Sequence, residues 1–204
     1  MKIETINCEN SNDTDLWADF KESLLSALKG TVFHLTSQHA FGLIQKSGAV
    51  EHNKNECFNL NTGSLKSFGR LMGWVCLFDL RHAKPELITD ILDRYDFCHP
   101  PGNLGSTEGS ENCSKRALAY LILDPRFYGQ LIHYEKYIEH TRKTGQYPMA
   151  IPKVETWIAN RIPIKWLEKV ILTKIGTIMT QAQIQRARVL EQAHRNLPWN
   201  RDYR

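Results

Sequence analysis

The sequence has no apolar run that approaches the roughly 20 residues needed for a helix to cross a bilayer. Its longest apolar stretches, 74–78 and 117–123, have the length of strands. The first residues contain no apolar h-region, so we expect neither a secretory signal nor a membrane partner. These expectations favour a cytoplasmic protein.

The number and spacing of the cysteines disfavour two further classes, a disulfide framework and a structural zinc site. The five cysteines are odd in number and form no Cys-x-x-Cys pair, which suits a reducing compartment better than a disulfide framework. Cys76 lies in an apolar stretch and is interpreted as a core residue. The remaining candidate ligands match no tetrahedral zinc signature, so no metal is expected. They are His52, Cys57, Cys98, His99 and Cys113.

The sequence also has no GxGxxG, Walker, HExxH or GxSxG motif, which disfavours Rossmann dehydrogenases, P-loop NTPases, zincins and serine hydrolases. It does have an ordinary globular composition, with 42% hydrophobic and 24% charged residues among 204. That length suits a single domain, 1–204, with a sizeable core. The formal net charge of +4 is mild, but basic residues gather from Lys165 onward, where acids are few.

Apolar spacing, caps and chain breakers predict helices and strands without an internal repeat. Thr36 or Ser37 caps a short helix that ends near Lys46, because Gly48 follows as a stop. Hairpin-length gaps are mixed with helices, which favours an α+β fold over a regular βαβ array. We expect helices at about 13–28, 36–46, 64–71, 85–92, 136–143 and 180–196, strands at 31–35, 74–80, 117–123, 128–133, 151–158 and 170–175, and irregular chain at 1–12, 51–63 and 96–115.

Three groups of polar residues stand out against this framework. Taken alone, each has an ordinary explanation: a structural histidine, a solvated arginine, or a strand glutamate that points to water. Their order along the chain is more informative than any one of them. The groups are His34 with Thr36 at a strand end, Ser67 with Phe68 and Arg70 before a strand, and Glu155 in the 151–158 segment.

The order of these residues resembles the ADP-ribosyltransferase fold, and in particular its DarT-type branch, which modifies nucleic acids. That branch opens with a His-hydrophobic-Thr strand and a short helix ending in Gly, followed by an Arg and, on a late strand, a catalytic Glu. The resemblance covers about 31–175 and implies a split, mixed or antiparallel sheet with flanking helices. The matching residues, in order, are His34, Thr36, Gly48, Arg70 and Glu155.

The resemblance implies NAD as the co-substrate and Glu155 as the catalytic residue. A carboxylate would stabilise the oxocarbenium-like sugar cation that forms when the N-glycosidic bond of NAD breaks. The branch usually has an Asn where this chain has Ala40, so one contact on the nicotinamide side differs. The implied NAD-binding residues are His34 at a ribose hydroxyl, Thr36 at the nicotinamide amide, Arg70 at the pyrophosphate, and Ser67 and Phe68 along the pocket wall.

Nucleic acid is favoured over protein as the acceptor, both by the resemblance and by the basic C-terminal part. The expected helix 180–196 would contact phosphate through its arginines, and the alternative is an ordinary solvated helix. The resemblance also implies a toxin or an effector of conflict between phage and host, with an antitoxin or inhibitor protein as a partner. The expected nucleic-acid-binding residues are Arg186, Arg188 and Arg195.

Two other functions stay open at this point. A non-catalytic module on the same scaffold would bind nucleic acid or protein through its basic face. An RNA 2′-phosphotransferase shares the fold and needs NAD, but it relies on His and Arg residues without a catalytic Glu. Stabilisation by NAD distinguishes the enzymes from the module, and activity of Glu155→Gln on 2′-phosphorylated RNA would indicate the phosphotransferase.

Overall fold

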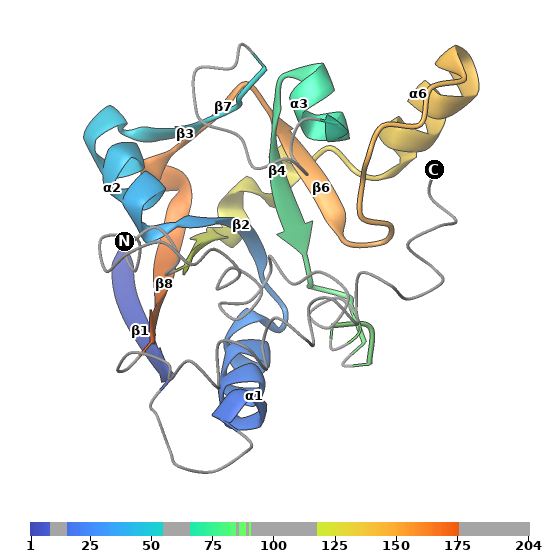
Figure 1. Cartoon of the computed structure of the whole chain (residues 1–204). Coiled ribbons are helices and arrows are strands. Elements are labelled where there is room, and N and C mark those ends of the chain that lie inside the picture. Colours follow the sequence, from blue (N-terminus) through green and yellow to red (C-terminus); the bar gives the residue numbers. More distant parts are fainter. Residues whose placement is uncertain (9–15, 55–65, 85, 89, 91–117, 176–204) are drawn as a thin grey trace, which may run out of the picture.

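A mixed α+β fold is built on one six-stranded sheet (Figure 1). The computed structural model of the chain describes residues 1–8, 16–54, 66–84, 86–88, 90 and 118–175. The outer pair β1·β8 is parallel, and every other neighbouring pair in this sheet is antiparallel. The strand order is β1 (Lys2–Cys8), β8 (Leu167–Ile175), β5 (Leu118–Leu123), β2 (Val32–Ser37), β4 (Trp74–Asp79) and β6 (Glu155–Ala159).

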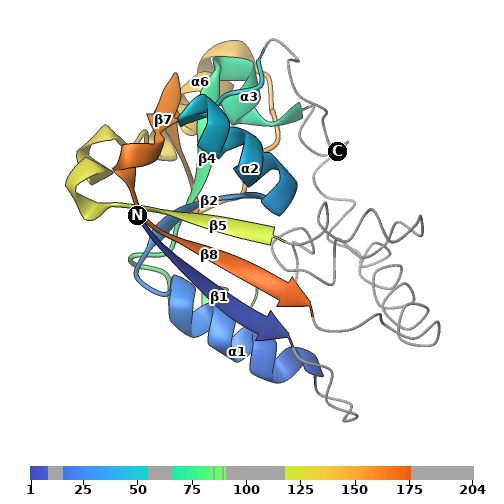
Figure 2. The same ribbon diagram turned by 90° about the vertical axis from the view of Figure 1, so that its left-hand side faces the viewer.

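Helices cover both faces of this sheet. Helix α1 (Leu16–Leu28) buries Leu24 and Leu28 against one face, and Figure 2 shows α1 alongside β1. Helix α2 (Gln38–Ser47) buries Phe41 against the other face, next to a small sheet of β3 (Ala49–Glu51) and β7 (Arg161–Pro163). Because β5 is covered on both faces, all six of its residues are buried, which explains its continuous apolar sequence.

Helix α2 begins and ends where its capping residues predict. The Ser37 side chain accepts a hydrogen bond from the backbone N–H of Ala40 at 3.0 Å. Gly48 adopts the left-handed conformation, with φ of 79°, and its N–H donates to the carbonyl of Ile44. The predicted short helix between a Ser or Thr cap and Gly48 is therefore confirmed.

Helix α3 (Phe68–Met72) packs closely against β6 through a group of rings, here called the aromatic cluster. A Cβ atom at Gly69 would lie only 2.7 Å from Cδ1 of Trp157, so glycine permits this close approach. Helix α6 (Glu135–Thr144) adds the rings of Tyr137 and His140, which contact Phe68. The cluster consists of Phe68, Trp74, Tyr134, Tyr137, His140 and Trp157.

The prediction that residues 1–12 form irregular chain is wrong for Lys2–Cys8. Strand β1 pairs with β8 from Lys2 to Cys8, at the edge of the sheet. Charged side chains are typical of edge strands, and here Glu4 accepts from Lys169 of β8 at 3.3 Å. The polar sequence of β1 therefore gives no strand signal, because this strand is held largely by backbone pairing to β8.

The predicted strand 128–133 is also wrong, because a 3₁₀ helix, η5 (Pro125–Gln130), occupies its first half. Asp124 caps this helix by accepting from the N–H of Arg126 at 2.9 Å, and Pro125 sets the first helical turn. Within the predicted range, Ile132 forms an isolated antiparallel bridge to Trp157. The cap-and-proline signal overrides the strand propensity of the residues that follow.

The expected helix 180–196 lies outside the described residues, together with Arg186, Arg188 and Arg195. The same holds for the expected loop 96–115 and for Cys57, Cys98, His99 and Cys113, so His52 is the described member of that candidate ligand set. In the ranges that are described, the helices are too short or too polar to span a membrane.

Candidate functional site

His34 lies at the point where β2 and β4 separate. The two strands pair over only two positions, Val32 with Asp79 and Phe33 with Phe78, whereas β4 and β6 pair over five. The next side chain along β2 is His34, whose Nδ1 lies 2.8 Å from the carbonyl oxygen of Cys76. A side chain therefore contacts β4 where the backbone ladder has ended.

This contact fixes the chemistry of the imidazole. A carbonyl oxygen only accepts, so Nδ1 carries the hydrogen and Nε2 is the acceptor in the neutral ring. Burial lowers the pKa of His34 below its ordinary 6.5 and outweighs the Cys76 carbonyl, which raises it. At neutral pH, His34 is thus an uncharged group that accepts hydrogen bonds at Nε2.

Glu155 is buried in β6, with 6% of its surface exposed, and is hydrogen-bonded at both oxygens. Oε1 accepts from the indole Nε1 of Trp157 at 3.0 Å and from Sγ of Cys76 at 3.3 Å. Oε2 accepts from the backbone N–H of Ile151 at 2.6 Å. Burial raises the pKa of Glu155 above 4.5, while these three donors act to lower it.

His34 and Glu155 therefore both contact Cys76, one at its carbonyl and the other at its thiol. The strand register places them on opposite faces of the sheet, since His34 pairs with Leu121 and Glu155 pairs with Phe78. The two side chains therefore do not line a common face, and Cys76 is the residue that contacts both.

The other predicted site residues occupy three different environments. Thr36 is half-buried on β2 opposite Ala119, on the same face as His34. Ser67 caps α3 by accepting from the N–H of Arg70, and Phe68 is completely buried, so its ring faces other rings of the aromatic cluster rather than an open pocket. Arg70 lines a separate groove whose described lining residues include neither His34 nor Glu155.

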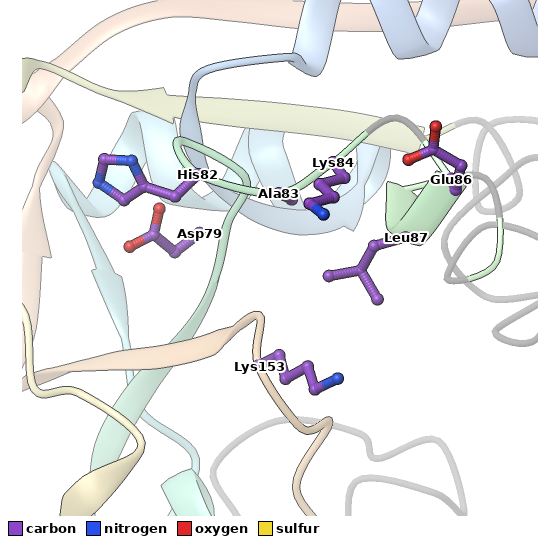
Figure 3. Close-up of a pocket in the computed structure, with 7 residues that line it drawn as sticks. All are labelled: Asp79, His82, Ala83, Lys84, Glu86, Leu87 and Lys153. Atoms are coloured by element: carbon purple, nitrogen blue, oxygen red, sulfur yellow. The ribbon is translucent and has the colours of Figure 1, made fainter.

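A hollow of about 560 Å³ borders the turn that precedes Glu155 (Figure 3). The backbone N–H of Asp79 donates to Val154 at 2.7 Å, which joins the end of β4 to this turn. Lys153 in the turn has a φ of 69°, a backbone conformation that is uncommon outside glycine. The hollow is lined by Asp79, His82, Ala83, Lys84, Glu86, Leu87 and Lys153, so both charge signs face it.

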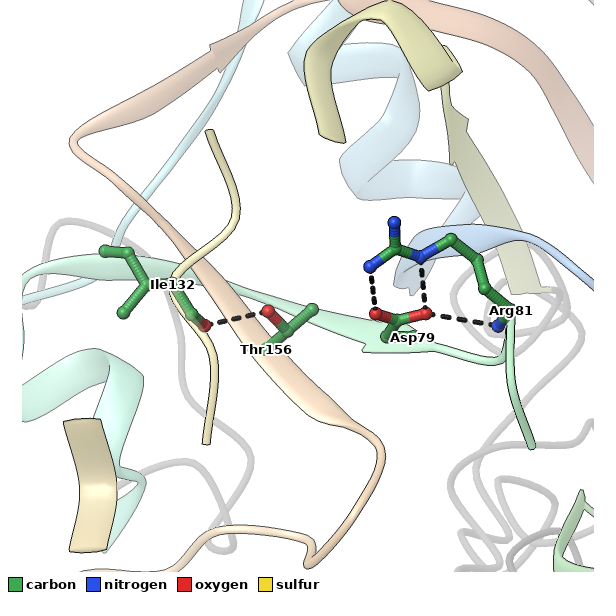
Figure 4. Close-up of polar contacts among 4 residues, drawn as sticks. All are labelled: Asp79, Arg81, Ile132 and Thr156. Carbon is green, nitrogen blue, oxygen red and sulfur yellow. Dashed lines mark hydrogen bonds and ion pairs between the residues drawn. The ribbon is translucent and has the colours of Figure 1, made fainter. Parts of the chain in front are cut away.

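The carboxylate of Asp79 is held by Arg81 through two parallel hydrogen bonds of 2.9 and 2.6 Å (Figure 4). Burial alone would raise the pKa of Asp79, but the hydrogen bonds and charge of Arg81 lower it below its ordinary value. The guanidinium also lies 4.5 Å from the ring centroid of Tyr128. This pair stabilises the end of β4, a role that sequence reasoning did not assign.

Figure 4 also shows how β6 is fixed on its outer side. The hydroxyl of Thr156 donates to the carbonyl of Ile132 at 2.8 Å, and Ile132 exchanges two backbone hydrogen bonds with Trp157. The two residues that follow Glu155 in β6 are therefore anchored to Ile132.

Within the described ranges, His, Cys, Asp and Glu side chains form no group of three or more suited to a metal ion. Comparison of the chain with protein-family models, with curated proteins and with solved structures found no match.

The buried Glu155 predicts a specific pH dependence of stability. Because its pKa is raised on folding, the folded state binds the proton more tightly than the unfolded state, and this stabilisation is lost as pH rises above 4.5. We expect the free energy of unfolding of the wild type, relative to Glu155→Gln, to fall with rising pH and then level off. Urea unfolding of both proteins from pH 4 to 8 measures this, and a difference that increases with pH would contradict it.

Proposed function

We propose that the protein is an NAD-dependent ADP-ribosyltransferase that modifies a macromolecular acceptor, with nucleic acid favoured over protein. The observation that carries the proposal is that a neutral histidine and a buried glutamate, on opposite faces of the sheet, both hydrogen-bond to Cys76 beside the separation of β2 from β4. The short β2·β4 ladder likewise supports the split-sheet, ADP-ribosyltransferase-like version of the α+β fold.

The reaction breaks one bond and forms one. The bond between C1′ of the ribose and the nicotinamide nitrogen breaks, and nicotinamide leaves with the electron pair. C1′ then bonds to a nucleophilic atom of the acceptor, which gives up its proton. Positive charge develops on the ribose between these events, and a fixed carboxylate such as Glu155 stabilises it because the charge is preorganised.

The two residues suit different parts of this reaction. In the neutral ring, Nε2 of His34 is an acceptor, which suits a ribose hydroxyl as donor. Glu155 suits the developing charge and the acceptor proton, because a raised pKa brings a carboxylate closer to the pH at which general bases work best. In this proposal, Cys76 is a positioning residue that joins the two.

The proposal predicts that NAD stabilises the folded protein. NAD at a hundred times its dissociation constant should raise the free energy of unfolding by about 2.7 kcal/mol. Melting temperature, measured with and without NAD, detects this. His34→Asn should reduce the shift, whereas Lys165→Gln, a change at an exposed position in η6 (Ile164–Trp166), should leave it unchanged. Absence of any shift at millimolar NAD would favour the non-catalytic module.

A further inference from the structure

A second concave region lies at α3, where Ser67, Arg70 and Leu71 line it. It is a groove of about 630 Å³, here called the basic groove. Its described lining residues include three cations and no acid, which distinguishes it from the mixed-charge hollow at the end of β4. The groove is lined by Lys54, Lys66, Ser67, Arg70, Leu71, Gln146, Tyr147 and Pro148.

Backbone hydrogen bonds hold two walls of the basic groove together. The N–H of Met149 donates to Lys66 and the N–H of Phe68 donates to Met149, each at 2.8 Å, so that Ser67 and Met149 form a parallel bridge. Gly145, with a φ of 68°, ends α6 and turns the chain into this second wall. The groove is thus formed by fixed backbone, which lowers the entropy lost when a ligand binds.

The third cation of the groove, Lys54, comes from the segment 52–54. The stem of Lys54 lies over Gly73, with Cδ only 3.1 Å from where a Cβ would be. Next to it, the Asn53 carbonyl accepts from Nε of Arg70 at 3.1 Å, which orients the guanidinium. Positive charges from segments 52–54 and 66–71 therefore border one concave surface. Segment 145–149 adds polar, aromatic and proline residues to the same surface.

Exposed apolar side chains lie among these charges. Tyr147 is 80% exposed, Met149 is 54% exposed and Leu71 is 45% exposed, although each is large enough to favour burial. Cations that track phosphates, together with an exposed aromatic ring on which bases stack, are the features with which proteins bind single strands. A peptide ligand would offer carboxylates to the cations but no series of flat rings for Tyr147.

We propose that the basic groove binds single-stranded nucleic acid, with Lys54, Lys66 and Arg70 at phosphates and Tyr147 stacked on a base. This assigns Arg70 to an acceptor strand rather than to the NAD pyrophosphate. Two rings connect the groove to the candidate site: Phe68 lies 5.0 Å from Trp157, whose Nε1 donates to Glu155. The role of the bound strand as the acceptor rests on the proposed transferase function. The binding of the strand to the groove does not depend on that function.

Fluorescence anisotropy of the full chain with labelled oligothymidylate or oligouridylate, without NAD, tests the binding. For single strands, each phosphate neutralised contributes about −0.7 to the slope of log affinity against log salt. Lys54→Gln/Lys66→Gln should therefore reduce the slope by about 1.4 and weaken binding at low salt. Tyr147→Ala should weaken binding about tenfold with little change of slope.

The matched control is Lys46→Gln/Lys165→Gln, which removes the same charge at exposed positions of α2 and η6. Three results would each overturn the proposal. The groove variant could bind as tightly as the wild type, the control variant could lose as much affinity as the groove variant, or the protein could bind an oligoglutamate peptide more tightly than the oligonucleotide. Melting temperatures of all variants establish that they fold. If the groove binds the oligonucleotide but NAD does not raise the melting temperature, only the transferase proposal is contradicted. If NAD raises the melting temperature but the groove does not bind the oligonucleotide, only the groove proposal is contradicted.

Discussion

Glu155→Gln should lower ADP-ribosyl transfer by at least about a hundredfold, the usual cost of removing a preorganised group that stabilises transition-state charge. The amide has the size of the carboxylate but no negative charge, so it cannot stabilise a sugar cation in the same way. Transfer of label from NAD to oligonucleotides, measured under single-turnover conditions, gives the rate. The fold of the variant is checked separately by melting.

Glu51→Gln provides the matched control for this loss. Glu51 lies exposed on β3, with its carboxylate 4.0 Å from Arg161, so the same chemical change should leave transfer unchanged. Transfer that persists at the wild-type rate in folded Glu155→Gln would remove this residue from the mechanism. Activity of that variant on 2′-phosphorylated RNA would instead indicate a phosphotransferase.

Trp157→Ala should reduce the free energy of unfolding by about 3–5 kcal/mol, the range for deletion of a large buried aromatic side chain. Trp157 has none of its surface exposed and contacts the rings of Phe68 and Trp74. Its indole N–H is also one of the donors that satisfy the buried carboxylate of Glu155. The substitution therefore leaves a cavity and removes a hydrogen bond at once, and urea unfolding measures both effects together.

Two companion variants separate these effects. Trp157→Phe retains most of the packing but removes the donor to Glu155, so it should cost about 1–3 kcal/mol. Trp166→Ala removes a half-buried indole that stacks on Phe127 at 4.6 Å, and it should cost less than Trp157→Ala. Equal losses in the two alanine variants would contradict a central role for Trp157 in the aromatic cluster.

The sequence predicted those parts of the fold that local signals determine. Capping residues define α2, and continuous apolar residues define β5, because each signal acts within a few neighbouring residues. Strand β1 was missed because its stability comes from pairing with β8, far along the chain. Helix η5 was misassigned because Asp124 and Pro125 begin a helical turn within residues that otherwise favour a strand.

For the candidate site, sequence order identified His34 and Glu155 but not what joins them. Cys76 was interpreted as a core residue, and nothing in the spacing indicates that its carbonyl and thiol contact both side chains. The basic groove was missed for a similar reason, since Lys54, Lys66 and Tyr147 come from separate segments. Such sites become visible only when strand pairing and helix packing are known.

The most direct test of the central claim measures both products of the proposed reaction. The wild-type protein is incubated with NAD and a single-stranded oligonucleotide. The nicotinamide released is quantified, and the mass of the oligonucleotide is measured by mass spectrometry. We predict release of nicotinamide in equal amount to oligonucleotide that has gained one ADP-ribose. Intact NAD and an unchanged acceptor, with folded protein and with DNA, RNA and lysate each offered in turn, would contradict the proposed transferase.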